Sequence, residues 1–104
     1  MKLNNPFLTA LGLARRAGKL VYGFESCVEN ANDIQLLFIA NDCSKRTQQS
    51  IKNIFEKSDT ELYSLNYSKN ELAYAIGTKP VGIIGIVDSG FTKLLKTKLS
   101  EEVI

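Results

Sequence analysis

Two long apolar stretches, IQLLFIAND at residues 34 to 42 and VGIIGIV at residues 81 to 87, restrict the fold of this chain more than any other feature. In each stretch apolar residues follow one another instead of alternating with polar ones, which is typical of strands covered on both faces of a sheet. Such a sheet needs helices on both sides. Because 104 residues bury a single core, we expect one domain spanning residues 1–104.

Shorter patterns predict the other elements. The segments KLVYG, residues 19 to 23, and TELYSLN, residues 60 to 66, indicate two further strands. Helices are predicted between the strands, because capping and stop residues stand at their ends. These residues are Asn5 with Pro6 and Gly18 for the first helix, Gly23 before the second, Ser44 before the third, Ser68 with Glu71 and Gly77 for the fourth, and Asp88 or Ser89 before the last. The alternation predicts an α/β fold, a three-layer α/β/α sandwich around a small mixed sheet of about four strands.

Apolar residues at helical spacing predict which helix faces are buried. The predicted inner positions are Phe7, Ala10, Leu11, Ala14 and Ala17 in the first helix, Phe24, Cys27, Val28 and Ala31 in the second, and Ile51, Ile54 and Phe55 in the third. At about 100° per residue, Arg15, Arg16 and Lys19 lie on the flank away from the first of these stripes. We therefore expect these three cations to face outward.

The net charge is too small for nucleic-acid binding by bulk attraction, since 13 Lys and Arg stand against 11 Asp and Glu, a difference of +2. Such binding would need a local patch. With no histidine and only Cys27 and Cys43, a usual four-ligand zinc site cannot form, and we expect no metal and no cofactor. The N-terminus lacks the features of a signal peptide, and no apolar run approaches the roughly 20 residues that span a bilayer. We therefore expect a soluble, cytoplasmic protein that binds no membrane.

Two residues leave room for other chemistry. Cys43 precedes a predicted helix N-terminus and the pair Lys45 and Arg46, both of which would lower the pKa of its thiol. Alternatively, Cys43 is simply a small residue at the end of a strand. Asp88 stands at a strand end, where α/β enzymes place catalytic groups, or it caps the following helix. Because no nucleophile–base pair is evident, we expect no catalytic residue, no enzyme activity and no small-molecule substrate.

The segment GLARRAGKLVYG, residues 12 to 23, gathers cations where the first helix gives way to a strand. They are Arg15, Arg16 and Lys19. Together with the free amides of the helix after Gly23, they can form a small anion-binding surface, and phosphate is the obvious anion. Tyr22 and Tyr67 could offer stacking faces to bases. The alternative is that these charges only solvate the surface.

This segment, with FIANDCS and AIGTKPVGIIGIVDSGF further along, stands in an order and spacing that resemble a known group of proteins. The chain resembles the kink-turn RNA-binding ribosomal protein superfamily, in particular its small bacterial YlxQ-type branch, from about Leu8 to Leu95. The resemblance implies a three-layer α/β/α fold and RNA binding without catalysis, often in a ribosome-associated setting. The implied partner is a structured RNA.

The resemblance also implies where the RNA interface lies. In the superfamily, the glycine that ends the first strand and the start of the next helix enter the widened major groove of a kinked RNA, at tandem sheared G·A pairs. A second loop covers the RNA with apolar side chains. In this chain the first segment is Gly23, Phe24, Glu25 and Ser26, and the second is Leu65, Asn66, Tyr67, Ser68 and Lys69. We expect both segments, with Arg15, Arg16, Lys19 and Tyr22, to form one rim of positive potential.

The helix after Gly23 departs from the superfamily pattern, which has a small residue, Asn, Glu, two further residues and Lys. This chain has Phe24, Glu25, Ser26, Cys27, Val28 and Glu29. A carboxylate thus stands where a lysine would meet phosphate. The acidic residues Glu25, Glu29 and Asp33 favour an alternative function, a protein-interaction module of the same fold that has lost kink-turn binding and docks to a translation factor or ribosomal protein. For either function we expect a monomer.

Overall fold

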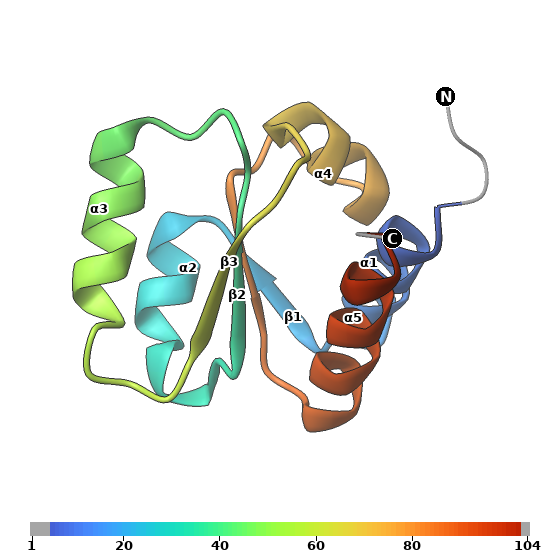
Figure 1. Ribbon diagram of the computed structural model, residues 1–104, viewed down its shortest axis with the longest axis horizontal. Coiled ribbons are helices and arrows are strands. Elements are labelled where there is room, and N and C mark those ends of the chain that lie inside the picture. The colour runs from blue at the N-terminus through green and yellow to red at the C-terminus, as the bar shows by residue number, and fades with distance from the viewer. Residues whose placement is uncertain (1–4, 103–104) are drawn as a thin grey trace.

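The computed structural model describes residues 5–102 and contains one four-stranded sheet between two layers of helices (Figure 1). The strands are β1 (Leu20–Tyr22), β2 (Leu36–Ile39), β3 (Glu61–Ser64) and β4 (Ile83–Ile86), in the spatial order β1-β4-β2-β3. β4 pairs antiparallel with β1 and β2, whereas β2 and β3 run parallel. The predicted mixed sheet and the three-layer α/β/α fold class are confirmed. The expected domain also includes residues 1–4 and 103–104, which lie outside the described residues.

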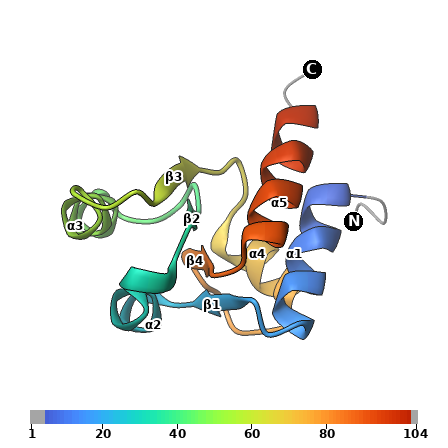
Figure 2. The ribbon, with the colours of Figure 1, turned by 90° about the horizontal axis from the view of Figure 1, so that it is seen from below.

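The helices divide between the two faces of the sheet (Figure 2). One layer consists of α1 (Pro6–Arg16), α4 (Lys69–Ile76) and α5 (Ser89–Glu101), and α1 packs against both of its neighbours. The other layer consists of α2 (Phe24–Glu29) and α3 (Lys45–Ile54), with a short 3-10 helix, η1 (Ala31–Asp33), after α2. Within residues 5–102, no helix combines the length and the apolar character needed to cross a membrane.

The predicted capping residues begin the helices. The side chains of Asn5, Ser44 and Asp88 accept hydrogen bonds from backbone N–H groups of the first helical turns, and Ser68 and Glu71 form a complete capping box. Each side chain satisfies an amide that has no partner within the helix. Gly77 ends α4 in the left-handed conformation, with φ +74°. Such signals are local, which explains why the sequence predicted them.

The two long apolar stretches form the centre of the sheet. Every residue of β2 and β4 is buried, as predicted for strands covered on both faces. Phe7 of α1 packs edge-on against Phe38 of β2, with ring centroids 5.2 Å apart. Each fully buried Leu, Ile or Phe side chain contributes about 1.5–3 kcal/mol to folding, so β2, β4 and α1 carry much of the stability.

Three predicted inner positions are not buried. Phe24 and Val28 on α2 are 39% and 37% exposed, and Ile54 on α3 is 43% exposed. The other predicted inner positions of these two helices, Cys27, Ile51 and Phe55, are buried in the core as predicted. Two further inner positions also differ, because Ala17 is exposed at the end of α1 and Ala31 lies in η1 instead of α2. The prediction was wrong because helical periodicity shows that a stripe is apolar but not how far a neighbouring element covers it.

Candidate nucleic-acid interface

Antiparallel pairing of β1 with β4 brings two loops together. The end of β1 lies beside the start of β4, and the Gly23 N–H donates a hydrogen bond to the Ile83 carbonyl at 2.8 Å. Gly23 has φ +93°, a backbone conformation that glycine adopts without a steric penalty. The β1–α2 turn at Gly23 and the α4–β4 loop, residues 77–82, therefore form adjacent walls of one surface.

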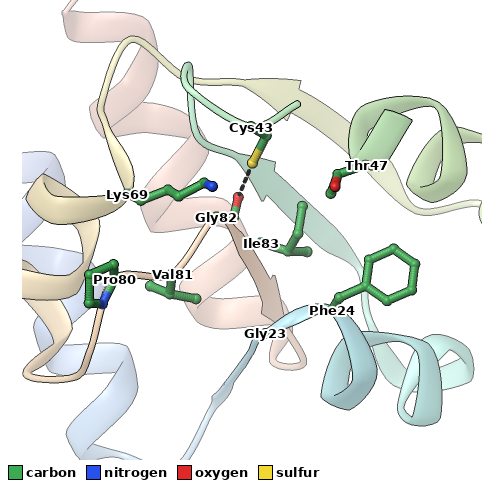
Figure 3. Close-up of a pocket in the computed structure, with 9 residues that line it drawn as sticks. All are labelled: Gly23, Phe24, Cys43, Thr47, Lys69, Pro80, Val81, Gly82 and Ile83. Carbon is green, nitrogen blue, oxygen red and sulfur yellow. Dashed lines mark hydrogen bonds between the residues drawn. The ribbon is translucent and has the colours of Figure 1, made fainter. Parts of the chain in front are cut away.

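A pocket of 260 Å³ lies between these walls (Figure 3). Phe24 and Thr47 line the end of the pocket between α2 and α3, and Lys69 points toward Gly82. The complete lining is Gly23, Phe24, Cys43, Thr47, Lys69, Pro80, Val81, Gly82 and Ile83. The pocket thus combines two glycines, several apolar side chains and one lysine from four segments that are distant in sequence.

The backbone of Lys69 is fixed by hydrogen bonds on both sides, although the residue lies at the surface. Its backbone N–H donates to Asp42 Oδ1 at 2.9 Å, and its carbonyl accepts from the Val81 N–H at 3.4 Å. The start of α4 is therefore tied to both neighbouring loops. Within residues 5–102 the Lys69 ammonium takes part in no ion pair, since the pairs there are Lys96–Glu61 and Lys98–Glu101. Its positive charge is therefore not neutralised by an ion pair with another described residue.

Cys43 packs under the α4–β4 loop. It is 7% exposed, and its Sγ donates to the Gly82 carbonyl at 3.4 Å. Burial raises the pKa of the Cys43 thiol, and this effect outweighs the nearby positive charge of Lys69. The hypothesis of a reactive thiol with a lowered pKa is therefore wrong. The carboxylate of Asp88 accepts a hydrogen bond from the Phe91 N–H and caps α5. Of the two interpretations of Asp88, the helix cap is confirmed.

Arg15 does not face outward as predicted. Its Nη1 donates to the Ile76 carbonyl at 2.7 Å, and its guanidinium lies 4.8 Å from the centre of the Tyr22 ring. The residue is half-buried between α4 and β1. Arg16 and Lys19 are exposed, in agreement with the sequence prediction.

The predicted single rim is divided in the structure. Lys19 stands before β1, where its carbonyl accepts from the Val87 N–H at 3.0 Å, whereas Gly23 follows β1 and bonds Ile83. At about 3.3 Å per residue, four residues of extended chain place these two positions about 13 Å apart. Arg16 ends α1 three residues before Lys19, and none of the three early cations lines the pocket.

Of the loop at residues 65–69, only Lys69 lines the pocket. Leu65 is 4% exposed and belongs to the core, so its side chain does not reach the surface. The Tyr67 ring stacks on Phe7 with centroids 5.7 Å apart, and its hydroxyl bonds Asn5 and Glu102. Burial and then the Glu102 carboxylate raise the pKa of Tyr67. Asn66 is exposed and Ser68 caps α4, so Lys69 is the member of this segment that lines the pocket.

The acidic residues of α2 lie on the surface beside the pocket. Glu25 and Glu29 are exposed, and neither forms an ion pair with another described residue. Ser26 is half-buried, and its carbonyl accepts a hydrogen bond from Asn30 Nδ2 at 2.8 Å. The arginines are therefore not neutralised by α2. Among the described residues, no three His, Cys, Asp or Glu side chains converge in a way that could hold a metal ion.

Sequence reasoning missed several pocket residues. Pro80, Val81 and Gly82 belong to the segment TKPVG, which stood in one of the quoted motifs but was not assigned to the interface. The sequence did contain a signal for this loop, because Lys79 and Pro80 stand between Gly77 and Gly82, directly before a buried strand. What was missing was the strand order, which alone places this loop beside Gly23.

Sequence comparison shows the family to which the chain is related. The sequence profile of the ribosomal protein L7Ae/L30e/S12e/Gadd45 family matches residues 7–96. A protein of Enterococcus faecium described as RNA-binding protein YlxQ is 37% identical over 93 residues, which cover 88% of this chain and 86% of that protein.

Solved structures show the same fold. A protein of unknown function from Bacillus halodurans superimposes with a TM-score of 0.84 at 24% identity, covering 93% of this chain and 99% of that one. The 15.5 kD RNA-binding protein of Giardia lamblia superimposes with a TM-score of 0.73 at 15% identity, covering 92% and 83%. At these identities the similarity concerns the fold alone.

Proposed function

The chain belongs to the ribosomal protein L7Ae/L30e/S12e/Gadd45 family, and from this premise we propose that it is a non-catalytic RNA-binding protein that recognises structured, kink-turn-like RNA. The relative named as an RNA-binding protein supports the first part of the proposal, because the two sequences align over most of their lengths. We further propose that the protein acts in the cytoplasm, in association with ribosomes or translation.

The observation that carries the proposal is the pocket between the Gly23 turn and the α4–β4 loop. A Cβ atom at Gly23 would meet nothing within 4 Å, so an RNA backbone or base edge can approach the protein backbone closely there. Phe24, which is 39% exposed, presents apolar surface, against which unpaired bases are commonly packed. The combination suits an RNA whose bases are splayed open.

The charged residues around the pocket have two kinds of proposed contact, with phosphates and with base edges. Lys69 in the pocket and Lys79, exposed on the α4–β4 loop, are placed to contact phosphates, which fix the orientation of the RNA. Glu25 at the start of α2 can accept hydrogen bonds from a guanine edge, because a carboxylate pairs with two donors. Arg16 and Lys19 fall outside this proposed interface, and Arg15 supports it from behind.

The proposal is tested by measuring binding to a kink-turn duplex and to the same duplex with its G·A pairs replaced by Watson–Crick pairs. We expect preferential binding to the kink-turn, and we expect Lys69→Ala to weaken binding and reduce the slope of log K against log salt by about one. Lys93→Ala, an exposed lysine on α5, is the control and leaves the slope unchanged. Equal binding to both duplexes, or binding to neither, would refute kink-turn recognition.

A further inference from the structure

The loop that joins β2 to α3 is bonded to both segments that supply Lys69 and Gly82 to the pocket. The Ala40 N–H donates a hydrogen bond to the Gly82 carbonyl at 2.8 Å. The next residue, Asn41, donates its N–H to the Tyr67 carbonyl, also at 2.8 Å. The β2–α3 loop therefore lies between the start of α4 and the α4–β4 loop.

Asp42 adds a side-chain bond to these backbone bonds. Its Oδ1 accepts from the Lys69 N–H, although the two residues are 27 positions apart. Lys69 is the first residue of α4, and the N–H of a first helical residue has no partner within the helix. The capping box of Ser68 and Glu71 satisfies only the amides of these two residues. Asp42 therefore binds an amide that the local capping residues leave free.

The side chain of Lys69 lies over Gly82. A Cβ atom added at Gly82 would be 3.5 Å from Lys69 Cε, and the lysine points toward this glycine in Figure 3. The Lys69 carbonyl accepts from the Val81 N–H at 3.4 Å. Together with the bonds made by Asp42 and Ala40, this contact closes a ring of hydrogen bonds through the β2–α3 loop, the start of α4 and the α4–β4 loop. The position of the Lys69 ammonium in the pocket depends on this ring.

The charge of Asp42 and its hydrogen bond have opposite effects on RNA binding. Asp42 directly precedes Cys43, which lines the pocket, but Asp42 itself does not line it. Within residues 5–102 its carboxylate forms no ion pair, so it bonds the backbone of Lys69 and leaves the ammonium unpaired. An anion next to a phosphate site weakens phosphate binding by its charge alone. A loss of affinity on removal of this carboxylate would therefore be a positional effect.

We propose that Asp42 is a positioning residue for RNA binding, which acts through Lys69 and does not contact the RNA. Its Oδ1 holds the first amide of α4, and this bond fixes the backbone from which the Lys69 side chain crosses Gly82 into the pocket. Binding needs the hydrogen-bond acceptor and not the negative charge. This inference rests on the proposed function, because it takes Lys69 as a phosphate contact.

The test separates the acceptor from the charge by measuring binding to the kink-turn duplex. Asp42→Asn keeps an acceptor oxygen and removes the charge, so it should bind at least as tightly as the parent, with the same slope of log K against log salt. Asp42→Ala removes both, and we expect the loss of one phosphate contact, which weakens binding about fivefold at about 0.15 M salt and reduces the slope by about one. Asp59→Ala is the matched control. It removes an exposed carboxylate before β3, at the opposite end of the sheet, and should not weaken binding.

Two further measurements show whether Asp42 acts through Lys69. In the Lys69→Ala protein, Asp42→Ala should cause no further loss of affinity, because the group that it positions is already absent. Without RNA, the amide hydrogen of Lys69 should exchange with solvent faster in Asp42→Ala than in the parent or in Asp42→Asn, as measured by NMR. Thermal unfolding checks that each variant is folded.

The outcomes distinguish this inference from the proposed function. A parent protein without preference for the kink-turn refutes the proposed function and this inference with it. If the parent has that preference, any of four results overturns this inference alone. They are parent-like affinity or slope in Asp42→Ala, an equal loss from Asp42→Ala in the Lys69→Ala protein, unchanged exchange of the Lys69 amide in Asp42→Ala, and a loss with Asp42→Asn as large as with Asp42→Ala.

Discussion

The guanidinium of Arg15 lies over the ring of Tyr22 while its Nη1 donates to the carbonyl of Ile76. Ile76 ends α4 directly before the α4–β4 loop, and Tyr22 directly precedes Gly23. One side chain of α1 therefore ties together the two segments from which the walls of the pocket extend. We therefore propose that Arg15 positions these two segments, whereas the sequence suggested a phosphate contact.

Replacement of Arg15 by alanine should lower the free energy of unfolding by about 1–3 kcal/mol, because a charge-assisted hydrogen bond and a cation–π contact are lost. We expect RNA affinity to fall while the slope of log K against log salt stays the same, since no phosphate contact is removed. Arg16→Ala, next to it and exposed, is the control for both measurements. A slope reduced by about one in Arg15→Ala would instead identify a direct phosphate contact.

Gly82 and Cys43 should be coupled in stability. A Cβ atom added at Gly82 would lie 2.5 Å from Cys43 Sγ, which is closer than side chains approach each other. We expect Gly82→Ala to destabilise the protein by about 1–3 kcal/mol, the usual cost of overpacking. Adding Cys43→Ala should recover part of this loss, because it removes the sulfur from the space that the new methyl group needs. Chemical denaturation of both single variants and the double variant measures the coupling, and strictly additive effects would contradict it.

Stability should decline in alkaline solution because of Cys27. Burial raises the pKa of this thiol from 9.0 to about 12, so above pH 9 the unfolded chain releases a proton that the folded protein keeps. Between these two values the free energy of unfolding should fall by about 1.4 kcal/mol per pH unit from this group. The measurement is denaturation against pH for the parent and for Cys27→Ala, each referred to its own stability at pH 7. Parallel curves for the two proteins would show that Cys27 is not the group responsible.

Cys43 should react slowly with iodoacetamide near neutral pH. Its thiol is almost fully buried and its pKa is raised, so little thiolate is present to attack the reagent. We expect labelling, followed by mass spectrometry of the peptide that contains Cys43, to be slower than labelling of free cysteine. Kink-turn RNA should slow it further, because the thiol lines the proposed binding pocket. A rate equal to or above that of free cysteine would contradict this view of the site.

Most of the secondary structure followed from the sequence because its signals are local. Asn5 and Ser68 act within one helical turn, and Gly77 needs only its own backbone conformation to end α4. The continuous apolar runs likewise predicted the two buried strands, β2 and β4. These features require no knowledge of what lies across the sheet.

The composition of the site could not be predicted in the same way, because it depends on pairings between distant segments. The sequence around Lys19 and Gly23 does not show that the strand between them pairs with β4. That pairing is what brings Val81 into the lining of the pocket. The sequence suggested that Tyr67 stacks on a base, whereas in the structure its ring stacks on Phe7. The proposed roles of the remaining interface residues stay predictions.

The order of the strands also bears on how the chain folds. β4 is the last strand along the described sequence, yet it lies between β1 and β2 and is the only neighbour that β1 has in the sheet. Until residues 83–86 are available, β1 has no partner and the hydrogen-bonding edge of β2 that faces β4 stays open. Because contacts between segments so far apart in sequence form slowly, these edges must stay shielded during synthesis until residues 83–86 supply the strand that closes them.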